Sequence, residues 1–136
     1  TSAEPKLIPL LRLSDVGGWK SFSRSTKVAL SESVEAVDEG LAQILPVIDE
    51  LGGIAVITAD HGNADEMFTV KNGKIEVKTS HSLNPVPFVI YDPNYSGEYK
   101  LADVENPGLT NIAGTLLNLL GYENVEDYDS SLIEFK

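Results

Sequence analysis

The chain has 136 residues, enough for one domain or for one part of a larger domain. Its 21 acidic and 10 basic residues give a formal net charge of -11. This charge argues against binding to nucleic acid or to an anionic membrane surface, because both depend on clustered Lys and Arg. An apolar share of 42% allows a buried core, and the absence of cysteine excludes disulfides and thiolate metal sites. We therefore expect a soluble, cytoplasmic protein without a signal or membrane-spanning segment.

The first long element is a helix predicted to begin near Thr26. Residues 1–25 before it show no sustained periodicity, and the one element expected there is a short strand near 7–13. Apolar residues in the helix recur at the three- and four-residue spacing of a single stripe: Val34, Val37, Leu41, Ile44, Leu45 and Ile48. Pro46 predicts a kink, or a shorter helix followed by another turn. The pair Gly52-Gly53 predicts the left-handed stop of the helix.

A buried strand is predicted over 53–59, because its branched apolar residues run without alternation. Asn72-Gly73 lies between two alternating runs and predicts a β-hairpin excursion over 68–77. This hairpin returns the chain to a second buried strand at 87–91. A loop at 92–107 and a second helix at 109–120, stopped by Gly121, follow. The acidic tail from Tyr122 onward is expected to cover a sheet edge.

The chemistry of the chain is concentrated at Asp60, His61 and His81. Asp60 and His61 end the first strand, and ligands in open α/β sheets bind beyond the carboxyl ends of strands. A carboxylate beside an imidazole suits a divalent metal of intermediate softness. His61 and His81 are the only histidines of the chain, and both lie at strand junctions. We therefore interpret these three residues as a convergent metal site.

Other interpretations of these residues stay open at the level of sequence. Asp60-His61-Gly62 is also typical of a simple strand-ending turn, and His81 of a partly buried structural histidine. The three side chains could serve a single ion, or His81 could serve a neighbouring one, since paired ions are common in phosphoryl transfer. Weaker candidates are Ser80 and Ser82 beside His81, the turn or solvent-facing carboxylates Asp65 and Glu66, and the hairpin lysines Lys71, Lys74 and Lys78, which are more typical of edge protection.

Two segments carry a resemblance to a known family. Residues 58–67 (TADHGNADEM) and 79–87 (TSHSLNPVP) resemble the cofactor-independent, that is 2,3-bisphosphoglycerate-independent, phosphoglycerate mutases of the alkaline phosphatase superfamily. Residues 34–41 and 109–113 also resemble the carboxyl-terminal region of that family. The resemblance covers residues 33–136, which we interpret as the carboxyl-terminal part of the metal-binding, phosphatase-like domain. Residues 1–32 form a poorly matched N-terminal segment.

The resemblance implies a fold, an activity and a set of ligands. It implies an α/β fold, with part of a mostly parallel sheet flanked by helices as in alkaline phosphatase. The family interconverts 3-phosphoglycerate and 2-phosphoglycerate in glycolysis, with two divalent ions, most often Mn²⁺, and without 2,3-bisphosphoglycerate. Asp60 and His61 would ligate the ion beside a nucleophilic serine, and His81 the ion that holds phosphoglycerate.

The chain also departs from the family pattern. The family is roughly four times longer, and its nucleophilic serine, one aspartate ligand and its substrate-binding arginines lie upstream of anything in this chain. A family motif, Asp-Met-Val-Gly-His-Thr-Gly, is replaced here by residues 19–25, which carry neither of its ligands. We therefore expect no catalytic residue in this chain, a missing remainder of the domain, and no activity in isolation. The alternatives are a truncated, degenerate copy that acts as a metal- or partner-binding module, or another phosphatase or phosphomutase of the superfamily.

Overall fold

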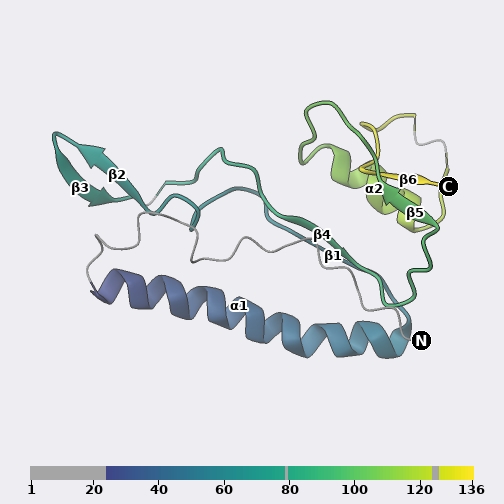
Figure 1. Cartoon of the computed structure of the whole chain (residues 1–136), viewed down its shortest axis with the longest axis horizontal. Coiled ribbons are helices and arrows are strands. Elements are labelled where there is room, and N and C mark those ends of the chain that lie inside the picture. Colours follow the sequence, from purple (N-terminus) through teal and green to yellow (C-terminus); the bar gives the residue numbers. More distant parts are fainter. Residues whose placement is uncertain (1–23, 79, 124–125) are drawn as a thin grey trace. The chain divides into compact units, whose positions relative to one another are not determined.

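The computed structural model describes residues 24–78, 80–123 and 126–136, with the backbone alone for 24–31 (Figure 1). The chain divides into two compact units, Thr1–Pro93 and Asn94–Lys136. We describe each unit by itself. The strand expected near 7–13 lies outside the described residues.

Helix α1 spans Arg24–Leu51 and confirms the long helix predicted from its apolar stripe. The helix continues through Pro46, so the predicted shorter helix followed by a separate turn is wrong. A proline removes one hydrogen bond from the helix interior, and the remaining turns of this long helix continue despite that loss. The stop lies where expected: Gly52 has a φ of 64°, and the Gly53 N–H donates to the Ile48 carbonyl at 2.9 Å.

Strands β1 (Ala55–Thr58) and β4 (Phe88–Tyr91) confirm the two apolar strands, and they pair side by side (Figure 1). Their register is antiparallel, from Ala55 opposite Tyr91 to Thr58 opposite Phe88. The α/β class holds, but the mostly parallel sheet is not confirmed, since every strand pair among the described residues is antiparallel. The excursion between β1 and β4 turns the chain back on itself, which favours antiparallel pairing. β1 is also only half-buried rather than buried on both faces.

The predicted hairpin is formed by β2 (Phe68–Lys71) and β3 (Lys74–Val77). Both central residues of its turn have positive φ, 52° at Asn72 and 75° at Gly73. This is the pattern of a type I′ turn, whose twist matches that of the flanking strands. The two-residue Asn-Gly signal therefore places the hairpin correctly.

The second unit consists of β5 (Tyr99–Leu101), α2 (Asn111–Leu119) and β6 (Ile133–Phe135). β5 lies inside the segment predicted to be a loop, so that part of the prediction is wrong. β6 belongs to the acidic tail and pairs antiparallel with β5, so the tail does cover a strand edge. Tyr99 and Ile133, one from each strand, are buried apolar side chains of this unit.

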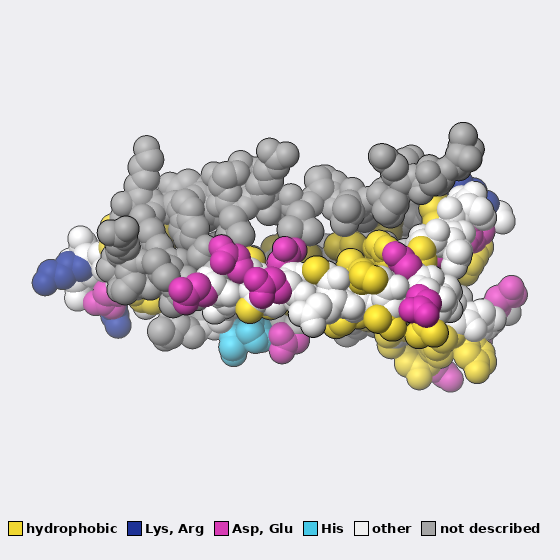
Figure 2. All heavy atoms as spheres, turned by 90° about the horizontal axis from the view of Figure 1, so that it is seen from below, with side chains coloured by type: hydrophobic (Ala, Val, Ile, Leu, Met, Phe, Trp, Pro, Cys, Tyr) yellow, Lys and Arg dark blue, Asp and Glu magenta, His cyan; other side chains and the backbone are white. Residues whose placement is uncertain are grey.

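The surface of the chain is rich in carboxylates. Figure 2 shows acidic side chains interspersed with apolar ones on the side of the molecule where α1 lies. Among the described residues, no helix is long and apolar enough to cross a membrane.

Candidate metal centre

The two histidines of the chain lie against each other. His61 follows β1, and His81 follows the β2–β3 hairpin, so the excursion between them brings the chain back to the end of β1. The ring centroids are 3.5 Å apart and the ring planes are tilted by 38°. His81 is exposed and His61 half-buried. Figure 2 shows imidazole atoms at the surface, so the pair can be reached from solvent.

Asp60 lies next to this pair but turns to solvent. Its Oδ1 is 3.6 Å from Nε2 of His61, and its side chain is 87% exposed against 34% for the imidazole. The two rings contact each other through their faces, whereas metal ligands direct nitrogen lone pairs within the ring plane toward one point. Accordingly, within the described parts of the chain, no three His, Asp or Glu side chains are arranged as a ready-made ligand set.

The backbone fixes the orientation of the His61 ring. Nδ1 of His61 lies 3.0 Å from the Gly62 carbonyl oxygen. In the tautomer protonated at Nδ1, that nitrogen donates to the carbonyl and leaves the lone pair of Nε2 available. A backbone carbonyl on the second ring nitrogen is a common device for orienting a metal-binding histidine. The nitrogen that remains available is the one nearest Asp60.

Gly62 joins the His61 segment to the His81 segment. Its carbonyl, besides contacting His61, accepts a hydrogen bond of 2.9 Å from the Ser82 N–H, within an isolated antiparallel bridge. Gly62 is buried, and a Cβ at this position would collide with the Ser82 hydroxyl and lie 2.7 Å from Oδ1 of Asp65. Only glycine therefore permits this approach of the two segments.

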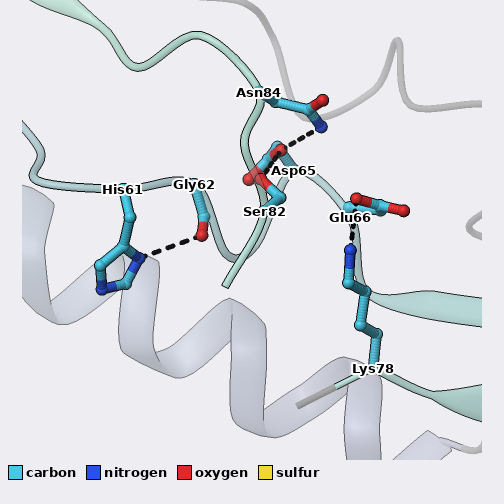
Figure 3. A network of polar contacts seen from close by, with 7 residues as sticks. All are labelled: His61, Gly62, Asp65, Glu66, Lys78, Ser82 and Asn84. Atoms are coloured by element: carbon cyan, nitrogen blue, oxygen red, sulfur yellow. Dashed lines mark hydrogen bonds and ion pairs between the residues drawn. The ribbon is translucent and has the colours of Figure 1, made fainter. Parts of the chain in front are cut away.

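Asp65 fastens the same two segments through its side chain (Figure 3). Its Oδ2 accepts hydrogen bonds from the Ser82 hydroxyl at 2.7 Å and from the Asn84 amide at 2.5 Å. The Ser82 bond in particular, helped by Asn84, lowers the pKa of Asp65 from its ordinary value of 3.8, while partial desolvation opposes the shift. The sequence suggested only a turn or a solvent-facing role for Asp65. No local spacing relates it to Ser82 or Asn84, so its role as a hydrogen-bond acceptor became visible only in three dimensions.

The base of the hairpin is closed by an ion pair. Lys78 Nζ donates to Glu66 at 2.6 Å (Figure 3). The Lys78 N–H donates to the Met67 carbonyl at 3.0 Å. The side chain of Lys78 is 20% exposed and that of Glu66 46% exposed. This lysine is therefore engaged within the chain rather than serving only as edge protection.

Comparison with known proteins places the chain in a family. The profile of the metalloenzyme superfamily matches residues 26–124, which include all three candidate ligands. The chain belongs to the metalloenzyme superfamily. This membership supports the expected dependence on divalent metal.

Individual relatives and a solved structure show which enzymes of this superfamily the chain is similar to. The chain is 42% identical over 131 residues to a 2,3-bisphosphoglycerate-independent phosphoglycerate mutase of Prunus dulcis, covering 89% of this chain and 26% of that protein. It is 39% identical over 116 residues to a probable enzyme of the same name from Leptospira interrogans. A crystal structure of Leishmania mexicana phosphoglycerate mutase at low cobalt concentration superposes with a TM-score of 0.68 at 39% identity, covering 76% of this chain and 21% of that chain.

These comparisons confirm the resemblance to the phosphoglycerate mutase family that the two sequence segments indicated. The family is enzymatic, and its members named here are mutases. The chain spans about a quarter of the length of the Prunus relative and about a fifth of the Leishmania structure. It therefore corresponds to a part of such an enzyme.

Proposed function

We propose that this chain is the carboxyl-terminal part of a metal-dependent phosphoglycerate mutase that interconverts 3-phosphoglycerate and 2-phosphoglycerate in glycolysis. The observation that carries the proposal is the meeting of His61 and His81, 3.5 Å apart, inside the two segments that resemble the family. Two imidazoles and the adjacent Asp60 carboxylate are donors that suit Mn²⁺ and related ions. A cytoplasmic location fits this reaction.

The donor set fits a divalent ion in its chemistry. Asp60 and His61 would hold one ion, and His81 would hold the other. The contact between His61 Nδ1 and the Gly62 carbonyl leaves Nε2 as the donor atom of that imidazole. The Asp60 carboxylate is 87% exposed, so it lies open to an ion from solvent.

The bound ions would supply charge that stabilises a phosphoryl group and lowers the pKa of an attacking serine hydroxyl. The residues of this chain contribute binding and orientation. The acidic character of the chain does not prevent it from meeting an anionic substrate, because bound cations reverse the local field. The nucleophilic serine and the further ligands belong to the remainder of the enzyme, so this chain alone is expected to be inactive and to bind divalent ions only through the ligands that it carries itself.

A degenerate remnant that acts as a metal- or partner-binding module is the second candidate. The family motif replaced at residues 19–25 favours it, because two expected ligands are lost there. Asn63 and the segment 84–87 lie within the two segments that resemble the mutase family, and this resemblance favours a mutase over other phosphatases of the superfamily.

The native polypeptide separates these candidates. We expect its intact mass, measured by mass spectrometry after recovery from its source, to exceed 14.7 kDa several-fold, and the recovered protein to show Mn²⁺-supported turnover of 3-phosphoglycerate. The isolated 136-residue chain should show none. A native mass of 14.7 kDa, or turnover by the isolated chain, would contradict the proposal.

A further inference from the structure

Asp65 stands outside the proposed ligands but is bonded to the segment that carries one of them. Its Oδ2 is the common acceptor for the Ser82 hydroxyl, at 2.7 Å, and for the Asn84 amide, at 2.5 Å. Ser82 directly follows His81 in the chain. Asp65 itself lies three residues after Gly62, whose carbonyl contacts the His61 ring.

The two links act on the same pair of segments. The first is the backbone bond from the Ser82 N–H to the Gly62 carbonyl. The second is the pair of side-chain hydrogen bonds that Ser82 and Asn84 donate to Asp65, which we call the clamp. The backbone bond alone is one isolated bridge rather than part of a continuous ladder. A side-chain attachment beside the backbone bond restricts the relative orientation of the two segments more than the backbone bond alone, because a satisfied network of hydrogen bonds is more rigid than a single one.

Burial identifies which part of this arrangement is structural. Gly62 and the Ser82 side chain are buried, whereas Asn84 and His81 are exposed. A hydroxyl buried in this way requires a partner, and among its recorded bonds that partner is Asp65. The ionised carboxylate strengthens the bond, since charge-assisted hydrogen bonds are the stronger class.

We propose that Asp65 is a positioning residue that sets the distance and orientation between His61 and His81, and through them the affinity of the site for divalent cations. This inference rests on the proposed function for its metal-binding consequence. Its geometric part, the approach of the two rings, stands without any metal.

The chemistry of the clamp yields two informative variants. Both bonds end on a single oxygen of Asp65, so Asp65→Asn can keep both acceptor contacts through its carbonyl oxygen, while it loses the charge and replaces the other oxygen with an amide donor. Asp65→Ala removes both contacts. Asp103→Ala is the matched control, because it deletes an exposed carboxylate in the second unit and lowers the net negative charge equally.

The experiment uses the full chain and its two histidines. With only two imidazoles, the Hε1 and Hδ2 signals of His61 and His81 can be assigned by NMR, and rings 3.5 Å apart should give an inter-ring NOE. We expect the NOE in the wild type, in Asp65→Asn and in Asp103→Ala, and its loss in Asp65→Ala. The Kd for Mn²⁺, from relaxation enhancement of the same signals, should rise about 10- to 100-fold in Asp65→Ala, the range for the loss of a residue that orients metal ligands.

Unfolding of the first unit, which carries Asp65 and both histidines, is excluded by the amide signals of β1 and β4, which should be unchanged in Asp65→Ala. An inter-ring NOE that survives in Asp65→Ala would overturn the inference, as would the absence of the NOE from the wild type. If the NOE depends on Asp65 while the wild type shows no Mn²⁺ binding at the histidines, the positioning role is supported and the proposed metal function fails. The two failures can thus be distinguished.

Discussion

At the scale of single residues, Gly62 is the position on which the candidate site most depends. Its carbonyl contacts His61 and accepts from Ser82, and its missing side chain is what allows Ser82 and Asp65 to approach. The same residue thus serves both links between the two histidine-bearing segments. A change here should disturb the site without altering any proposed ligand.

We expect Gly62→Ala to lower the free energy of unfolding by about 1–3 kcal/mol, because the added Cβ overpacks a buried contact. Urea unfolding followed by circular dichroism measures this change. Gly40→Ala is the control: a Cβ at Gly40, in α1, meets nothing within 4 Å and should stabilise the helix by about 0.5–1 kcal/mol. Equal effects of the two substitutions would contradict the packing assigned to Gly62.

Asp65 gives stability a dependence on pH whose sign follows from its lowered pKa. The folded state holds the carboxylate ionised through the bonds from Ser82 and Asn84, so the pKa is lower than in the unfolded chain. The stabilisation is therefore fully present above the ordinary value of 3.8 and is lost as pH falls through the lower folded-state pKa. Asp65→Asn should flatten the acid limb of stability against pH in unfolding experiments, and an unchanged acid limb would argue against the clamp.

At the scale of elements, the second unit is tied together by Thr115 in α2. Its side chain is fully buried, and its hydroxyl donates to the Asn111 carbonyl at 2.8 Å. The same hydroxyl accepts from the Leu132 N–H at 2.8 Å, next to β6. Asn111 adds a bond from its amide to the Ser130 carbonyl at 2.8 Å. α2 is therefore fastened to the acidic tail by buried polar contacts.

Thr115→Val keeps the shape of the side chain but removes both hydroxyl bonds. We expect a loss of about 1–3 kcal/mol in the free energy of unfolding, because the Leu132 N–H is left without that acceptor. Thr115→Ser retains the hydroxyl and should cost about 0.8 kcal/mol for the deleted methyl group. Urea unfolding of the two variants measures both changes in the free energy of unfolding. A larger loss of stability in Thr115→Ser than in Thr115→Val would show that packing rather than hydrogen bonding matters at this position.

Elements with a strong local signal could be predicted from the sequence. The stripe of α1, the apolar runs of β1 and β4, and the Asn72-Gly73 turn each depend on residues close in sequence. β5 was missed because its three residues gain their strand geometry from β6, more than thirty positions later. The antiparallel pairing of β1 with β4 likewise depends on the path of the intervening chain.

The residues of the candidate site also fall into those that could be predicted from the sequence and those that could not. Asp60, His61 and His81 could be selected from their residue types and their places at strand junctions. Asp65, Ser82 and Asn84 could not be given their roles, because a carboxylate in a turn is ordinary and its partners lie 17 and 19 positions away. The resemblance to the family marked both segments without indicating how they are joined.

At the scale of the whole molecule, the chain leaves much apolar surface exposed. The described buried apolar residues are Met67, Val89, Tyr99 and Ile133. Several large apolar side chains on α1 are at least half exposed: Val37, Ile44, Val47 and Leu51. Apolar surface of this kind is typical of contact with further protein. It agrees with a chain that spans about a quarter of the length of its Prunus relative.

The central claim, that His61 and His81 both belong to a centre that binds divalent cations, is tested most directly by titrating the 136-residue chain with Mn²⁺ and following its aromatic NMR signals. The paramagnetic ion broadens the nearest protons most strongly. We expect both imidazole signals to broaden together, ahead of the ring signals of Tyr122 and Tyr128, which are exposed in the acidic tail and report non-specific attraction to carboxylates. Broadening of the tyrosine signals at equal or lower Mn²⁺, with the two imidazoles unaffected, would contradict the claim.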